Sequence, residues 1–141
     1  MDQRPDYRVH IDEIHHIHKL DAPSGTAITL ARDIDLKSAR YSGFELQEQS
    51  AVGSAQLAVG SGQWAVGRVH PTASIPVPIN SERTGEVPGK HVVSWTSSND
   101  RIVISHEAFD RTGFAQGAVV AAEWLRGRTG LFTMDDVLDA S

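Results

Sequence analysis

Apolar and polar residues alternate along residues 7–14, the first patterned stretch of the chain. Val9, Ile11 and Glu13 fall on one face of this segment, and the residues between them fall on the other. A period of two is typical of a β-strand whose two faces meet different surroundings. The pattern therefore predicts a strand over residues 7–14.

A helix is predicted to begin shortly after Pro23. Proline disfavours the helical conformation in the residue before it, and Ser24 is a good N-cap residue. Apolar residues then recur at i, i+3, i+4 and i+7, the spacing of an amphipathic helix that we expect to run to about residue 39. These residues are Ala27, Leu30, Ala31 and Ile34.

Residues 41–74 are predicted to form a variable connector rich in Gly, Ser and Ala. The tripeptide Ala-Val-Gly occurs in it three times at intervals of seven residues. Glycine in every copy disfavours a helical coiled coil, and units of seven residues are too short for a solenoid. We therefore interpret the stretch as loop, with irregular strand near Leu57 and Trp64.

The pattern sharpens again after the connector. Two prolines make residues 75–79 extended, as an edge strand or a bulged one, and residues 83–89 are rich in turn formers. Residues 90–97 and 101–109 both alternate, which predicts an antiparallel hairpin. One face of each strand carries three residues: His91, Val93 and Trp95 on the first, and Ile102, Ile104 and His106 on the second.

The last patterned segment, residues 113–126, has an apolar stripe of mainly small residues and predicts a closely packed helix. The stripe consists of Phe114, Ala118, Ala121, Ala122 and Leu125. Residues 133–136 resemble a capping box, with Asp in place of Glu or Gln, that opens a short final turn. The whole order indicates an α+β fold: a mixed, mostly antiparallel sheet with helices on one face, in a single domain over residues 1–141.

Composition limits the size, the partners, the metal sites and the location that this chain can have. The 141 residues are about one domain's worth, and a net charge of −5 without any Lys/Arg run makes nucleic acid and anionic membranes unfavourable partners. The absence of cysteine excludes disulfides and thiolate metal sites. No apolar stretch approaches the ~20 residues that span a bilayer, and we expect a cytoplasmic location.

The segment with the most candidate functional groups lies around the start of the predicted first helix. Its first turn would present unpaired backbone N–H groups at Gly25 and Thr26, and the helix dipole favours an anion there. The hydroxyl of Ser24 or Thr26 would add a donor, and Lys19 supplies a cation nearby. These features suit a small dicarboxylate ligand.

His15 and His16 would lie close to such an anion and can donate a proton near neutral pH. A structural interpretation also exists, since a single histidine is more often a surface residue and Ser-Gly-Thr before a helix is more often only a cap. A metal site is a further alternative, because His10, His16 and His18 share strand parity. No carboxylate or further histidine follows at typical zinc spacing, so we assign no metal.

Residues 13–27 read E-I-H-H-I-H-K-L-D-A-P-S-G-T-A. They resemble the signature E-x-H-H-x-x-K-x-D-A-P-S-G-T-A of the dihydrodipicolinate reductases, lysine-pathway enzymes also called 4-hydroxy-tetrahydrodipicolinate reductases. Residues 83–91, R-T-G-E-V-P-G-K-H, resemble the family's R-x-G-x-x-x-G-x-H stretch. Residues 106–118 and 131–138 resemble two later family stretches, so the resemblance covers nearly the whole chain outside residues 41–74.

The resemblance implies a reductase whose N-terminal Rossmann domain binds NADPH or NADH. Its C-terminal domain would bind the small dicarboxylate substrate and build a homotetramer through its sheet. On this chain the resemblance assigns catalysis to His15, as the general acid that protonates the ring, and to Lys19, which would stabilise the developing charge. It assigns substrate binding to four residues: His16, Ser24, Gly25 and Thr26.

No Gly-x-Gly-x-x-Gly/Ala motif precedes the signature. We therefore interpret the chain as the substrate-binding and oligomerisation domain of such a reductase in lysine (diaminopimelate) biosynthesis, with the Rossmann domain absent. We expect the chain alone to bind no nicotinamide cofactor and to be inactive in hydride transfer. Two alternatives stay open: an oligomerisation module without ligand binding, and a His-rich metal-binding domain.

Overall fold

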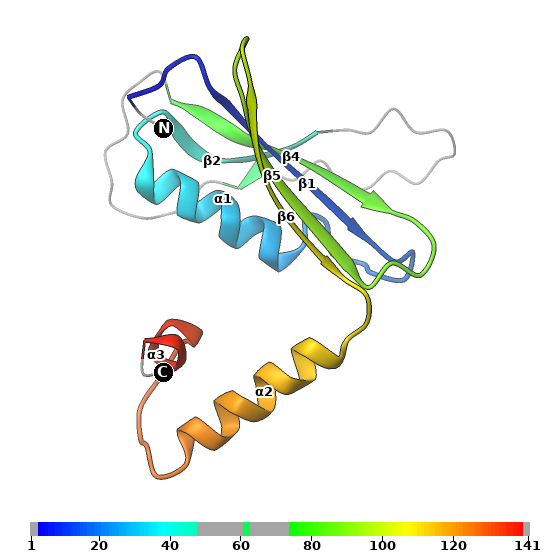
Figure 1. The fold of residues 1–141 in the computed structure, drawn as a ribbon, viewed down its shortest axis with the longest axis vertical. Coiled ribbons are helices and arrows are strands. Elements are labelled where there is room, and N and C mark those ends of the chain that lie inside the picture. Colours follow the sequence, from blue (N-terminus) through cyan, green and yellow to red (C-terminus); the bar gives the residue numbers. More distant parts are fainter. Residues whose placement is uncertain (1–2, 48–60, 63–73, 140–141) are drawn as a thin grey trace. The chain divides into compact units, whose positions relative to one another are not determined.

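The computed structural model describes residues 3–47, 61–62 and 74–139 (Figure 1). The chain divides into two compact units, Met1–Glu107 and Ala108–Ser141. A single domain over residues 1–141 stays a prediction. Among the described residues, no helix is long and apolar enough to cross a membrane.

The first unit combines a six-stranded sheet with one helix, and the strand order is β3-β2-β4-β1-β5-β6. Strands β1 and β2 are both parallel to β4, whereas β1–β5 and β2–β3 are antiparallel pairs. The mixed sheet confirms the α+β class. The elements are β1 (Arg8–His15), α1 (Gly25–Lys37), β2 (Tyr41–Gln47), β3 (Ser61–Gly62), β4 (Ile75–Arg83), β5 (Gly89–Thr96) and β6 (Arg101–Ala108).

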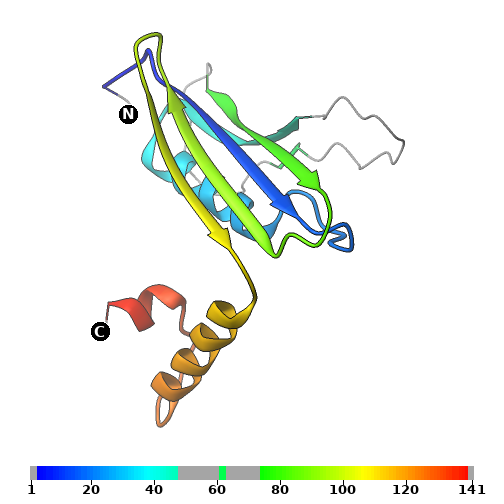
Figure 2. The same cartoon turned by 45° about the vertical axis from the view of Figure 1, so that its right-hand side comes forward.

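Strand β1 confirms the predicted alternation. Its even positions are exposed or half-buried, and its odd positions are buried. Helix α1 lies along the sheet in both views (Figures 1 and 2), and the core forms between them. Burying a large aliphatic or aromatic side chain there stabilises the fold by about 1.5–3 kcal/mol. The buried core residues are Val9, Ile11, Ala27, Ala31, Tyr41, Phe44, Val77 and Ile79.

Helix α1 begins and ends close to its predicted bounds. The Ser24 hydroxyl is the N-cap and accepts a hydrogen bond from the Ala27 N–H at 3.3 Å. The buried Ala27 and Ala31 let the helix approach the sheet closely. Asp35 is also buried in this helix, and its carboxylate accepts from the Gly43 N–H of β2 at 2.8 Å. The cap and this bond fix how α1 is placed along the strands.

Strand β4 is longer and more central than the sequence predicted. The prolines predict an edge strand or a bulged one, and the edge alternative is wrong, because β4 lies between β2 and β1 and continues to Arg83. Its pairing with β1 begins only at Ile79, which lies opposite Ile11. Pro76 and Pro78 therefore lie where β4 is paired on one side, and a residue without an N–H is tolerated there.

The predicted connector over residues 41–74 begins too early. Its first seven residues form β2, with Tyr41, Phe44 and Leu46 buried. A register shift between Tyr41 and Phe44, with Gly43 at φ 69°, breaks the alternation that would have revealed the strand. Leu57 and Trp64, where irregular strand was expected, lie outside the described residues.

Strands β5 and β6 form the predicted hairpin. The Ser97 N–H donates to the Asp100 carbonyl at 2.9 Å and closes the turn. Three residues of β5 share one face, as predicted, and register against β1 shows that it is the core face: His91 lies opposite Glu13, Val93 opposite Ile11 and Trp95 opposite Val9. Strand β6 lies at one edge of the described sheet, opposite the β3 edge, and every residue of it except the last is exposed.

The second unit consists of α2 (Thr112–Leu125) and α3 (Met134–Leu138). The close packing predicted for the stripe of α2 is wrong for this structure, because no residue of the helix is buried. The short turn around α3 agrees with the prediction, since the Asp136 carboxylate accepts from the N–H and the hydroxyl of Thr133. Trp124 packs edge-on against Phe132, with ring centroids 5.1 Å apart.

Candidate functional site

Several chain segments that carry polar residues meet at one end of the sheet. The parallel strands β1 and β4 end there, at His15 and Arg83, which are register partners. Strand β5 begins there at Gly89, and α1 begins there at Gly25. The carboxyl ends of parallel strands and the N-terminus of a helix are common places for anionic ligands.

Glu13 lies at the centre of this arrangement, with a side chain that is 0% exposed. Its Oε2 is hydrogen-bonded to Nδ1 of His15. Its Oε1 accepts from Nη2 of Arg83 at 2.9 Å and from the Ser24 N–H at 3.1 Å. Burial raises the pKa of Glu13, but the Arg83 guanidinium, the Ser81 hydroxyl and the Ser24 N–H together outweigh burial and hold this pKa below its usual range. The buried carboxyl is therefore ionised at neutral pH.

The His15 imidazole is held between Glu13 and the backbone of β5. Burial lowers the pKa of His15, and the Glu13 carboxylate opposes this shift without reversing it. An added Cβ at Gly89 would lie 3.1 Å from Nε2 and 3.3 Å from Cδ2 of His15. A side chain at position 89 would therefore crowd this edge of the ring, and glycine leaves it open.

Ser24 connects α1 to the same cluster. Its hydroxyl lies 2.9 Å from Nε2 of His91, whose ring is edge-on to that of His15 with centroids 5.1 Å apart. Burial, and then the neighbouring His15, lower the pKa of His91. Gly25 and Thr26 follow Ser24 in the first helical turn, where N–H groups lack intrahelical acceptors. An added Cβ at Gly25 would meet nothing within 4 Å, so the space beside it is open.

Lys19 lies on the turn between β1 and α1. Its Nζ donates to both carboxylate oxygens of Asp21, at 2.7 and 2.8 Å. The hydrogen bond from Lys19 lowers the pKa of Asp21. Arg83 holds this turn through bonds to the carbonyls of Lys19 and Asp21, at 3.2 and 2.5 Å. The same guanidinium thus fixes the turn and pairs with Glu13.

The structure connects several of the predicted site residues through their hydrogen bonds to Glu13 and Arg83. Ser24 joins the cluster around His15 through Glu13, and Gly25 and Thr26 follow it in the chain. Arg83 joins Lys19 to the same cluster. His16 is half-buried directly after His15, and its ring faces that of His18 with centroids 6.1 Å apart. The functional roles of these residues stay predictions.

Three residues of the cluster were missed as site residues: Glu13, Arg83 and His91. All three lie in residues 13–27 or 83–91, the two stretches that resemble the reductase signature. One further signal was available, because Glu13 precedes His15 by two residues and so shares its face of the strand. A carboxylate on the face of Val9 and Ile11 needs a buried partner, and His15 is the nearest candidate. Nothing in the spacing indicates that Arg83 and His91 are also partners.

A metal site was considered on His10, His16 and His18, but the described residues bring together a different group. Glu13, His15 and His91 offer ligand atoms within 4.8 Å of one another. These donors already have protein partners, and the Arg83 guanidinium on the carboxylate of Glu13 disfavours a second cation there. We assign no metal to this group.

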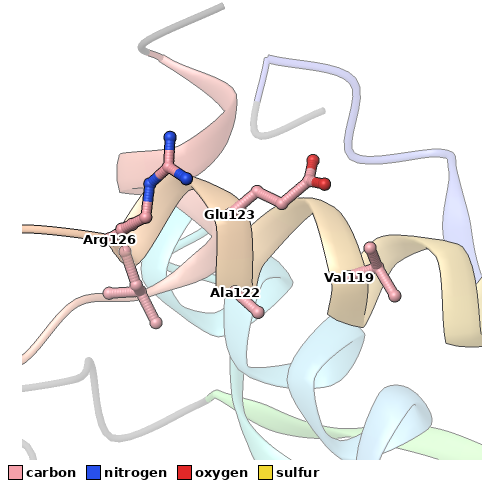
Figure 3. A pocket seen from close by; sticks show the side chains of 5 residues that line it. Val119, Ala122, Glu123 and Arg126 are labelled. Carbon is pink, nitrogen blue, oxygen red and sulfur yellow. The ribbon is translucent and has the colours of Figure 1, made fainter.

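A separate open hollow of about 660 Å³ lies along α2. Figure 3 shows its lining, which comes from α2 and its C-cap residue Arg126 and contains none of the predicted site residues. Glu123 and Arg126 are its charged residues, and the rest are aliphatic: Val119, Ala122 and Leu125. An open surface without converging polar groups is a poor small-molecule site. The cluster of polar residues around Glu13, at the end of the sheet, is therefore the candidate site.

Comparisons with known proteins agree on one family. The family model described as "Dihydrodipicolinate reductase, C-terminus" matches residues 1–138. A 4-hydroxy-tetrahydrodipicolinate reductase of Christiangramia forsetii is 44% identical over 133 residues, which cover 94% of this chain and 46% of that relative. One from Akkermansia muciniphila is 40% identical over 134 residues, covering 94% and 48%. The chain spans about half the length of the curated relatives it matches.

A solved structure is similar as well. It is named dipicolinate bound dihydrodipicolinate reductase, from Paenisporosarcina sp. TG-14. The two share 25% sequence identity with a TM-score of 0.51, over 79% of this chain and 37% of that one. The similarity in structure thus points to the same family as the similarity in sequence.

Proposed function

This chain belongs to the dihydrodipicolinate reductase family, whose C-terminal part it matches over residues 1–138, and we propose that it binds the substrate of such a reductase and donates the proton. The observation that carries the proposal is the His15 imidazole, hydrogen-bonded to the buried Glu13 carboxylate, next to the open N-terminus of α1. The name of the similar solved structure, which is bound to dipicolinate, supports a ring dicarboxylate as the ligand.

The first turn of α1 suits one carboxylate of that ligand. The N–H groups of Gly25 and Thr26 are at an exposed helix start, where the helix dipole also favours an anion. Lys19 adds a positive charge from the neighbouring turn, and His16 is the next residue after the proton donor. Together they would place the substrate ring beside His15.

His15 would then protonate the ring. Burial keeps the pKa of the free imidazole low, so the chain without ligand holds it mainly neutral at neutral pH. A bound dianion favours the imidazolium, because an opposite charge nearby raises the pKa of a histidine. Substrate binding thus charges the proton donor at the moment when it is needed.

In an intact reductase of this family, NADPH or NADH supplies the hydride when bound. The described residues do not fit such a cofactor. A dinucleotide fingerprint places glycines in the turn between a strand and a helix. The two described connections of this kind, residues 16–24 and 109–111, contain no glycine. We therefore assign no cofactor-binding step to these residues, and inactivity of the chain alone in hydride transfer stays a prediction.

We predict that the chain binds dipicolinate weakly and takes up a proton as it does so. Weak binding is expected because domain closure normally completes such a site. Affinity should rise as the pH falls toward the lowered pKa of His15, since the complex favours the imidazolium. Calorimetry in buffers of different ionisation enthalpy measures both the affinity and the proton uptake.

A pair of variants tests the location of this binding. Gly25→Asp places a negative charge at the start of α1, in open space, and is expected to abolish binding. Thr29→Asp makes the same charge change one turn later on an exposed position and is expected to bind nearly as well. If calorimetry of the unchanged chain detects no heat of binding at millimolar dipicolinate, the proposal is contradicted.

An assembly role is a second candidate, favoured by the exposed edge of the sheet. Strand β6 presents Ile102 and Ile104 at 44% and 67% exposure, and contiguous exposed apolar side chains mark interaction surfaces. An edge strand also has unpaired backbone groups that another chain can pair with. The homotetramer implied by the family resemblance would cover such a surface.

Sedimentation tests the assembly role. We expect the chain to sediment as an oligomer at micromolar concentration, and Ile104→Lys to shift it toward monomer. Ile75→Lys is the matched control, because Ile75 is 43% exposed at the start of β4, away from β6. A clean monomer of the unchanged chain argues against assembly through this edge.

A further inference from the structure

The two oxygens of the Glu13 carboxylate have different partners. Oε1 accepts two hydrogen bonds, from Nη2 of Arg83 and from the backbone N–H of Ser24. Both donors always carry hydrogen, since a guanidinium stays charged and a backbone amide cannot rotate its hydrogen away. Oε1 must therefore remain an acceptor. Oε2 is the oxygen that contacts Nδ1 of His15.

This division determines the hydrogen on His15. The Glu13 carboxylate is ionised, and an ionised carboxylate only accepts hydrogen bonds. The short contact between Oε2 and Nδ1 is then a hydrogen bond only if Nδ1 carries the hydrogen. In the neutral ring Nε2 is consequently the unprotonated nitrogen. It is the ring atom nearest to a Cβ added at Gly89, at 3.1 Å, so glycine at this position spares it a side-chain contact.

We propose that Glu13 is the positioning residue for His15: its carboxylate holds the imidazole as the Nδ1–H tautomer and directs Nε2 to take up and deliver the proton. This inference rests on the proposed role of His15 as the proton donor. Glu13 itself touches no substrate in this scheme, since its side chain is fully buried. It acts only through the ring of His15 and through the Ser24 backbone.

The tautomer matters because it decides which ring nitrogen gains and loses the proton. With hydrogen on Nδ1, Nε2 takes a proton from solvent to give an imidazolium that Glu13 stabilises, and the ring returns to its neutral form when Nε2–H is delivered. With the opposite tautomer, the nitrogen left to take up a proton would be Nδ1, which faces the buried Glu13 carboxylate. Without that uptake the neutral ring could deliver its Nε2 hydrogen only by becoming an imidazolate, and a neutral imidazole is a far weaker acid than an imidazolium.

Glu13→Gln tests the proposal without any ligand or turnover. Arg83 and Ser24 still require an acceptor at the position of Oε1, so the amide oxygen of the new side chain is expected there. Its NH₂ group then faces Nδ1 of His15, which must become the acceptor. We expect the His15 ring to change from Nδ1–H in the unchanged chain to Nε2–H in the variant.

The measurement is a long-range ¹H–¹⁵N correlation spectrum of the histidine rings in the full chain, with EDTA present. The shifts of the two ring nitrogens report which one carries hydrogen. Glu86→Gln is the matched control, because Glu86 lies 3.5 Å from His18 in an exposed pair. It makes the same chemical change next to a histidine and is expected to leave the His15 signals where they are.

Two results would overturn the proposal: an Nε2–H tautomer in the unchanged chain, or the same His15 tautomer in Glu13→Gln as in the unchanged chain. Circular dichroism checks that the variant folds. Should it not fold, the tautomer of the unchanged chain decides, since a Glu13 that does not set the ring would leave Nε2–H as the major form.

Dipicolinate titration of the same samples separates this inference from the proposed function. The expected tautomers without dipicolinate binding support the positioning role of Glu13 and overturn the proposed function. Dipicolinate binding by an unchanged chain whose His15 is the Nε2–H tautomer supports the proposed function and overturns the positioning role of Glu13.

Discussion

Arg83→Ala is expected to lower the free energy of unfolding by about 3–5 kcal/mol at neutral pH, the typical cost of removing one partner of a buried ion pair. The Arg83 side chain is 10% exposed and that of Glu13 is 0% exposed. Without the guanidinium, the Glu13 charge would keep one backbone donor and the His15 ring. The carbonyls of Lys19 and Asp21 would lose a shared donor as well.

The same variant has a predictable pH dependence. The lowered pKa of Glu13 means that its stabilising contribution is present above its unfolded value and is lost as the pH falls through the folded pKa. Without Arg83, burial dominates and the pKa of Glu13 rises, so the variant takes up a proton and loses less by acidification. The stability difference between the two proteins should therefore shrink in acid.

Urea unfolding followed by circular dichroism at neutral and acidic pH measures this difference. Arg32→Ala is the control, because Arg32 is exposed on α1 and should change stability little. A loss below about 1 kcal/mol at neutral pH, typical of an exposed pair, would show that Arg83 and Glu13 are not a buried ion pair in solution.

Lys19→Ala is expected to lower the turnover of an active reductase by about 100–1,000-fold, the usual effect of removing a group that stabilises charge in the transition state. Dipicolinate affinity should fall much less, because the first turn of α1 still holds a carboxylate. Asp21 holds the Lys19 ammonium close to the site through two hydrogen bonds, so its charge is placed before the ligand arrives.

This experiment uses a fusion in which the part of the Christiangramia forsetii relative that this chain does not cover precedes this chain, which covers 46% of that relative. Nicotinamide oxidation gives kcat and KM, and calorimetry on the chain gives the dipicolinate affinity. Lys37→Ala, in the exposed last turn of α1, is the control for loss of a positive charge. A rise in KM with unchanged kcat would contradict a role for Lys19 in the transition state.

The sequence predicts those elements of the fold whose periodicity is regular. Strand β1, helix α1 and the β5–β6 hairpin follow their predicted bounds closely, since each has a strict period or a recognisable cap. Strand β2 was missed because its register shift interrupts the alternation. The second half of β4 is polar, and its place between two parallel strands depends on a crossover through α1 that local pattern does not reveal.

For the candidate site, the sequence predicts the residues but not their partners. The signature names His15, Lys19 and the start of α1, and their chemistry suits an anionic ring. It does not show that Glu13 is shared between His15, Arg83 and Ser24, because these bonds join residues up to 70 positions apart. Such contacts arise from strand register, which is set only when the sheet forms.

The place of β1 within the sheet determines how this protein can adapt. Glu13 and His15 lie on the same strand and the same face as Val9 and Ile11, so the proposed proton donor can leave its place only when the core loosens. Local fluctuations and tolerated substitutions belong mainly to segments of low local stability. We therefore expect changes in ligand preference within this family to accumulate in the turn over residues 16–21 and at the start of α1. We expect His15, the proposed acid, to change only together with the core.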